Sequence, residues 1–173
     1  MRLRAQQGMV LAMALIMLAL LSFLAGISIR GASSAEQVAN QGRLKALAQQ
    51  TAEAALRFCE QQVQANAADP ALGFAPEDEP AAATAYTWEF MDHWDKAPAS
   101  HLRTVSVKAA GDTEAAAYFM RPAECMSQYM DSGHKVVVTT ARGFGPEVPA
   151  RKDKDKNPPK GTEIWLQSVV TLE

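Results

Sequence analysis

The stretch MVLAMALIMLALLSFLAGISI, residues 9–29, decides the fold of this chain. It contains no charged residue and no proline. About 20 apolar residues in a helix are enough to cross a bilayer core of about 30 Å, whereas the apolar part of a secretory signal is only about 7–15 residues long. We therefore expect residues 9–29 to form a transmembrane helix that remains part of the mature chain.

The helix is predicted to continue beyond the apolar run, through residues 30–66. In this part, apolar or small side chains recur at steps of three and four residues, which is the spacing of one face of an amphipathic helix. The positions are Leu44, Leu47, Ala48, Thr51, Ala55, Phe58, Cys59 and Val63. This stripe is expected to pack against a globular domain formed by residues 67–173.

Three glycines, Gly26, Gly31 and Gly42, interrupt the predicted helix. A glycine weakens a helix interior by about 1 kcal/mol relative to alanine. Two interpretations stay open: the glycines mark places where the helix bends or melts, or they allow neighbouring helices to approach closely.

The globular domain is predicted to be an α+β unit, in which the long helix packs on a small antiparallel sheet. Alternating and β-branched side chains indicate the strands. The predicted strands cover residues 102–109, 116–121, 135–141 and 164–172. The last two form a hairpin around the charged loop 150–161, the aromatic segment 86–94 is a strand or a short helix, and residues 122–130 are a connecting element.

The expected topology predicts a disulfide between the two cysteines, Cys59 and Cys125. Arg2 and Arg4 precede the apolar run, and positive charge at that end places it in the cytoplasm. Both cysteines then lie beyond the inner membrane, in an oxidising compartment that favours a disulfide. A closed loop of about 67 residues would stabilise the fold by about 4 kcal/mol in the chain-entropy model; two free buried thiols are the alternative.

Neither composition nor motifs indicate an enzyme or a cofactor. The formal net charge of −2 gives no basic surface for nucleic acid. The sequence lacks the signatures of serine hydrolases, zinc proteases and phosphate-binding loops. We therefore expect no catalytic residue and no bound cofactor.

Two groups of residues have some resemblance to metal ligands. His93 lies between Asp92 and Asp95, but their spacing is not specific for a metal. The second group alternates as calcium ligands do, although lysines separate its members. It consists of Asp153, Asp155 and Asn157. A polar surface and a solvated charged loop are the simpler expectations, so no metal site is predicted.

The aromatic side chains of residues 86–94 have two interpretations. Trp88, Phe90 and Trp94 are expected to belong to the core of the domain. If some of them are exposed, they become candidates for an interface with a partner subunit.

The N-terminal region resembles that of type IV prepilins, with a short basic leader, Gly8, an apolar span and a continuing helix. The stretches LAQQTAEAALR (47–57), TTARGFG (139–145) and WLQSVV (165–170) are similar to sequences in PilX-type minor pilins. The resemblance implies that residues 1–8 are a leader peptide. A prepilin peptidase would cut after Gly8, and the new N-terminal residue, Met9, would be methylated.

Met13 is the main departure from the prepilin pattern. Major pilins carry a glutamate at this place, the fifth residue after the cut, where this chain has a methionine. A carboxylate buried in an apolar environment needs a partner. The resemblance implies that subunits lacking the glutamate belong at the pilus tip, so Met13 is expected to determine the position of the subunit.

The resemblance implies a minor pilin that takes part in type IV pilus assembly, in a tip or priming complex. The implied partners are other minor pilins, further pilus subunits, the prepilin peptidase and a tip adhesin. The expected location is the inner membrane, crossed once with a periplasmic domain, and later the pilus. The alternatives are the tip pseudopilin of a type II secretion system and a single-pass anchored periplasmic enzyme or binding module.

Overall fold

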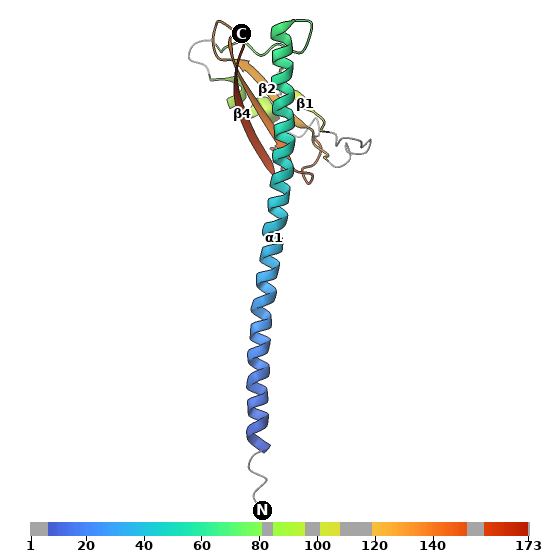
Figure 1. Cartoon of the computed structure of the whole chain (residues 1–173), viewed down its shortest axis with the longest axis vertical. Coiled ribbons are helices and arrows are strands. Elements are labelled where there is room, and N and C mark those ends of the chain that lie inside the picture. The colour runs from blue at the N-terminus through green and yellow to red at the C-terminus, as the bar shows by residue number, and fades with distance from the viewer. Residues whose placement is uncertain (1–6, 81–84, 96–100, 108–118, 152–157, 173) are drawn as a thin grey trace, which may run out of the picture. The chain divides into compact units, whose positions relative to one another are not determined.

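A computed structural model shows the chain in Figure 1. It describes residues 7–80, 85–95, 101–107, 119–151 and 158–172. The chain forms two compact units, Met1–Gly42 and Arg43–Glu173. The charged loop that contains Asp153, Asp155 and Asn157 falls outside the described residues, as do parts of the predicted strands 102–109 and 116–121.

Helix α1 extends from Gln7 to Ala68 and has 62 residues. It is helical throughout, including at Gly26, Gly31 and Gly42, so the single helix predicted over residues 9–66 is confirmed. An alanine Cβ at Gly26 or Gly42 would meet nothing within 4 Å. No close packing partner is therefore present at these two glycines among the residues that the structure describes.

The second unit contains a four-stranded antiparallel sheet with the strand order β1-β2-β3-β4. The strands are β1 (Arg103–Val105), β2 (Ala123–Tyr129), β3 (Val136–Phe144) and β4 (Glu163–Thr171). Strands β3 and β4 pair along their whole length, which confirms the predicted hairpin. Together with α1, the sheet makes the α+β fold that the sequence indicated.

The C-terminal part of α1 packs on one face of the sheet (Figure 1). Gly143 on β3 allows this close approach, because a Cβ there would overlap the backbone of Ala48 and Ala52. Thr51 adds a polar contact: its hydroxyl donates to the carbonyl of Ala48 at 2.8 Å and accepts from the backbone N–H of Phe144 at 3.1 Å. The backbone of α1 is thus held in contact with the backbone at the C-terminal end of β3.

The buried stripe of α1 differs in two positions from the predicted one. Phe58 was expected in the core and is 39% exposed, whereas Ala52 was not included and is fully buried. The reason is the short distance between the helix and the sheet, which leaves room for alanine and glycine but not for a phenyl ring. Leu44 and Leu47, near the end of the contact, are only partly buried.

Two short helices, η1 (Thr87–Glu89) and α2 (Met91–Asp95), lie on the opposite face of the sheet. Trp94 of α2 contacts Trp165 edge to face, with 4.8 Å between the ring centroids. Trp165 is paired with Arg142, whose side chain points away from the α1 side because successive residues of a strand alternate. The aromatic segment is therefore helical, the second of its two predicted forms.

Two strand predictions are wrong. Residues 122–130 were expected to be a connection and instead contain β2, a central strand. The alternation that marks a strand is missing because both faces of β2 are covered and nearly every residue is buried. Residues 119–121 of the predicted strand 116–121 are not in a strand, and within the described part of the predicted strand 102–109 β1 covers Arg103–Val105.

Candidate functional site

The N-terminal half of α1 carries a continuous apolar surface. We define this apolar helix surface as Val10, Leu11, Met13, Leu15, Ile16, Met17, Leu18, Leu20, Leu21, Phe23 and Leu24, each at least 59% exposed. Because the helix advances 100° per residue, the consecutive residues 15–18 reach all of its sides. Apolar surface of this extent is typical of protein–protein or membrane interaction sites.

The membrane prediction needs a correction. Over the part of the chain that the structure describes, no helix combines the length and the apolar character needed to cross a membrane. This finding overturns the expected single-pass inner-membrane location.

The predicted processing site lies at the start of α1. The helix begins at Gln7, so the bond between Gly8 and Met9 belongs to its first turn. Met13 lies on the apolar helix surface and is 66% exposed. Its thioether side chain brings no charge to that surface. The cleavage after Gly8, the methylation of Met9 and the positional role of Met13 remain predictions.

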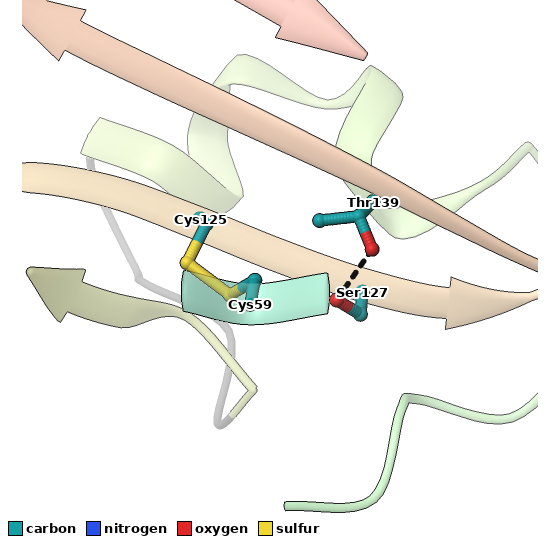
Figure 2. The surroundings of a disulfide bond; sticks show 4 residues. All are labelled: Cys59, Cys125, Ser127 and Thr139. Atoms are coloured by element: carbon teal, nitrogen blue, oxygen red, sulfur yellow. Dashed lines mark hydrogen bonds between the residues drawn. A yellow bond between two sulfur atoms is a disulfide. The ribbon is translucent and has the colours of Figure 1, made fainter. Parts of the chain in front are cut away.

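Cys59 on α1 and Cys125 on β2 form a disulfide (Figure 2). Both residues are 0% exposed, and their Cα atoms are 6.4 Å apart. Ser127 lies two residues further along β2, where its hydroxyl shares a 2.9 Å hydrogen bond with that of Thr139 on β3. The disulfide fixes the helix to a central strand, and the alternative of two free thiols does not hold.

A buried group of charges, the arginine cluster, lies between α2 and the sheet. Its centre is Arg142 of β3, which is 0% exposed. Nη2 of Arg142 donates to Oδ1 of Asp95 at 2.9 Å and to Oε2 of Glu124, and Nη1 donates to Oε1 of Glu163 at 3.4 Å. Two more arginines join it, since Arg121 donates to the Glu124 carboxylate at 3.2 Å and Arg151 donates to the backbone carbonyl of Asp95 at 2.6 Å.

The electrostatics of the arginine cluster favour the charged state at its centre. Burial by itself lowers the pKa of Arg142, but Glu124 and Asp95 outweigh it and hold this pKa above its ordinary value. Glu163 behaves differently, because burial raises the pKa of its carboxyl and Arg142 offsets this only in part. The acidic and basic groups pair with one another, although Nε of Arg121 is buried without an acceptor among the described residues. The cluster links α2 to three strands of the fold.

An open groove of about 430 Å³ lies between η1, α2 and the outer strand β4. Its walls include Trp88, Met91 and Trp165. The indole N–H of Trp88 is buried and has no hydrogen-bond acceptor among the described residues. Met91 is 48% exposed and Trp165 is 37% exposed. The groove is therefore an apolar surface feature with one unused donor in its wall.

Of the two groups considered as metal ligands, only the one around His93 lies in the described residues, and there His93 and Asp95 have other partners. The ring nitrogen Nδ1 of His93 is bonded to the carbonyl oxygen of Thr87 at 2.9 Å, while Asp95 belongs to the arginine cluster. Within the described part of the chain, no group of histidine, cysteine or acidic residues is arranged to hold a metal ion. Of the three aromatic residues, Trp94 is core, Trp88 is partly buried and Phe90 is 47% exposed.

The sequence analysis did not identify the arginine cluster. Arg142 follows the β-branched run Val136–Thr140, and a charged residue within so apolar a strand needs a buried partner. That signal was present in the sequence. However, the partners of Arg142, Asp95 and Glu124, are distant in sequence and lie in segments that were predicted as an aromatic segment and a connecting element.

Comparison with protein-family models, with curated proteins and with solved structures gave no match for this chain.

Proposed function

We propose that this chain is a minor subunit of a type IV pilus that acts in pilus assembly, in a complex with other minor pilins at the filament tip. The observation that carries the proposal is the apolar helix surface at the beginning of α1, which is exposed on all sides of the helix. Such a helix is incomplete as a single chain, and neighbouring helices of the same kind would cover it.

Burial of this surface would provide the free energy of assembly. Each large apolar side chain contributes about 1.5–3 kcal/mol when it is fully buried. Much of this total offsets the loss of rotational and translational freedom on association. Helices that pack side by side with axes 8–10 Å apart cover such surfaces efficiently, which supports a filament built around a bundle of these helices.

Met13 supports a special position in that filament. A carboxylate in a helix bundle must find a positive partner, because burying an unpaired charge is costly. Met13 brings no such requirement and offers no such partner to a neighbour. A subunit of this kind suits the end of a filament better than its repeating interior.

Intact-mass measurement of the protein from the cells that produce it tests the proposal. The proposed processing removes residues 1–8 and adds one methyl group to Met9. Loss of both changes in a strain without the prepilin peptidase provides the control. A mature chain that still begins at Met1 in the presence of the peptidase would refute the minor-pilin function.

A further inference from the structure

The outer edge of β4 is a feature of the second unit to which the proposed function gives no role. β4 has nine residues and is the last strand of the sheet among the residues that the structure describes. Its sequence from Ile164 to Thr171 contains no charged residue and no proline. Proteins usually protect such an edge with lysine, proline or a covering segment, because its unpaired backbone groups pair readily with another strand.

The opposite edge of the sheet is formed by β1, which has only three residues and covers residues 123–125 of β2. Beyond β1, the chain around Glu77 pairs with β2. The N–H of Glu77 donates to the carbonyl of Ser127 at 2.8 Å, and the N–H of Tyr129 donates to the carbonyl of Glu77 at 2.8 Å. β4 thus differs from the edge strand β1 in length, with nine residues against three.

The hydrogen-bond pattern identifies which backbone groups of β4 face outward. Gly145 donates to the carbonyl of Thr162 at 2.9 Å, and Leu172 donates to the carbonyl of Lys135 at 2.7 Å. Bonding toward β3 therefore falls on even-numbered residues, since the direction alternates along an antiparallel strand. The N–H and C=O groups of residues 163, 165, 167, 169 and 171 point away from β3, and among them Trp165, Gln167, Val169 and Thr171 are exposed.

We propose that this edge binds a second copy of the same chain, with the two β4 strands paired antiparallel around a two-fold axis at Gln167. This register aligns all nine residues of both strands. It places Trp165 opposite Val169, Glu163 opposite Thr171, and Gln167 opposite its own copy. The proposal concerns a surface outside the apolar helix surface and does not depend on the proposed function.

The side chains are complementary in this register. Trp165 and Val169 are 37% and 63% exposed, and an aromatic residue opposite a β-branched one is a favourable cross-strand pair. Val169 of the second copy also lies beside the groove that Trp88 and Met91 form with Trp165. The two copies of Glu163 lie at opposite ends of the paired strands, so like charges do not face each other.

The helices leave room for the pairing. Ala48 and Ala52 pack over Gly143, which places this part of α1 over β3. In the joined sheet, β3 and its copy are three strand spacings apart, about 14 Å. Two packed helices need only 8–10 Å between their axes. An interface of one strand pair is small, so the dimer is expected to be weak and to depend on concentration.

Cysteine cross-linking of the full chain in mild detergent tests this register. Gln167→Cys places a thiol opposite its own copy, so oxidation should give a covalent dimer. Thr171→Cys is the matched control on the same exposed face, because Thr171 faces Glu163 and lies far from its own copy. We expect at least about tenfold more dimer from Gln167→Cys than from Thr171→Cys, which corresponds to about 1.4 kcal/mol.

A second variant tests the backbone pairing. Val169→Pro removes an N–H that points outward and breaks no bond to β3, so in the Gln167→Cys background it should suppress the dimer while the thermal unfolding temperature shows a folded chain. Val169→Ala keeps that N–H and should retain more dimer than the proline variant. Equal cross-linking of Gln167→Cys and Thr171→Cys, no cross-linking of either, or cross-linking to a different protein alone would overturn the proposal.

Discussion

Nη2 of Arg142 lies 2.9 Å from Oδ1 of Asp95, and this contact joins strand β3 to helix α2 where solvent has almost no access. The two residues are 47 positions apart in the sequence. Around them, the rings of Trp94 and Trp165 lie about 5 Å from the guanidinium carbon of Arg142, at 5.3 and 5.1 Å. One arginine therefore holds together the short helices, β2 through Glu124, and the outer hairpin.

Arg142→Met should lower the free energy of unfolding by about 3–5 kcal/mol, because it leaves Asp95 and Glu124 as buried carboxylates without their main partner. Urea unfolding with the disulfide intact measures this change. Arg57→Met is a suitable control, since Arg57 is exposed on α1 and its replacement should change the stability by no more than about 0.5 kcal/mol. A loss for Arg142→Met no larger than that of the control would contradict a stabilising role of the cluster.

The free energy of unfolding should depend on pH through the carboxyl group of Glu163. Burial raises the pKa of its carboxyl above the ordinary value of 4.5, with Arg142 acting in the opposite direction. The folded chain therefore keeps this proton to higher pH than the unfolded chain does. The resulting stabilisation is complete below pH 4.5 and is lost as the pH rises through the raised pKa. Unfolding curves between about pH 3 and 7 should show that Glu163→Gln removes this loss.

Glu147 should give a pH dependence of stability with the opposite sign. Burial acts to raise the pKa of Glu147, but hydrogen bonds with Thr162 outweigh it and leave this pKa below 4.5. Its contribution is therefore present above pH 4.5 and is lost as the pH falls through the lowered pKa. Glu147→Gln should remove that acid-side loss, and pH profiles that are the same for both variants would argue against these assignments.

Gly143→Ala tests the close approach of α1 to the sheet. The added Cβ would overlap the backbone of Ala48 and would lie 2.7 Å from the Cα atom of Ala52. Since backbone atoms cannot move aside cheaply, we expect a loss of about 1–3 kcal/mol. Gly42→Ala is the matched control, because nothing lies within 4 Å of its new Cβ. It should stabilise the helix by up to about 1 kcal/mol, and a loss of similar size in both variants would show that tight packing is not the cause.

The elements that were predicted correctly are those whose signal is local. Helix α1 and the hairpin of β3 and β4 follow from periodicity and β-branched composition within each segment. β2 was missed because its residues are buried on both faces, including the polar Glu124 and Gln128, which are 1% and 2% exposed. Their partners come from other parts of the chain, and a single sequence does not contain those pairings.

The same distinction applies to the candidate site. The pairing of Cys59 with Cys125 could be predicted from the sequence because two cysteines permit only one connectivity. The exposed position of Phe58 could not be predicted, because helical spacing gives the direction of a side chain but not the distance to the surface it faces. The predicted inner-membrane location, which was based on the apolar composition of residues 9–29, was wrong, because no helix in the described part of the chain is long and apolar enough to span a bilayer.

Replacing both cysteines, as Cys59→Ala with Cys125→Ala, should lower the free energy of unfolding by about 4 kcal/mol, since the disulfide closes a loop between residues that are 66 positions apart. Unfolding should be measured with and without reductant. The reductant should destabilise the unchanged chain by a similar amount and leave the double variant unaffected. If the double variant is as stable as the unchanged chain, the link between α1 and β2 contributes no stability.

Met13→Glu tests whether the apolar helix surface is buried in an assembled filament and whether Met13 has positional meaning. The change places a carboxylate among Val10, Met17 and their neighbours, where burial without a partner is costly. If neighbouring helices cover this surface, the variant should be incorporated less often at the filament end. Alternatively, it should move to the repeating interior, where a positive group of a neighbour can pair with the new carboxylate. Quantitative mass spectrometry of sheared filaments, together with gold labelling of the subunit, measures both effects. Val38→Glu is the matched control, because Val38 is equally exposed, at 69%, on the same helix but outside the apolar helix surface. Unchanged stoichiometry and position for Met13→Glu would show that Met13 does not determine where the subunit is placed.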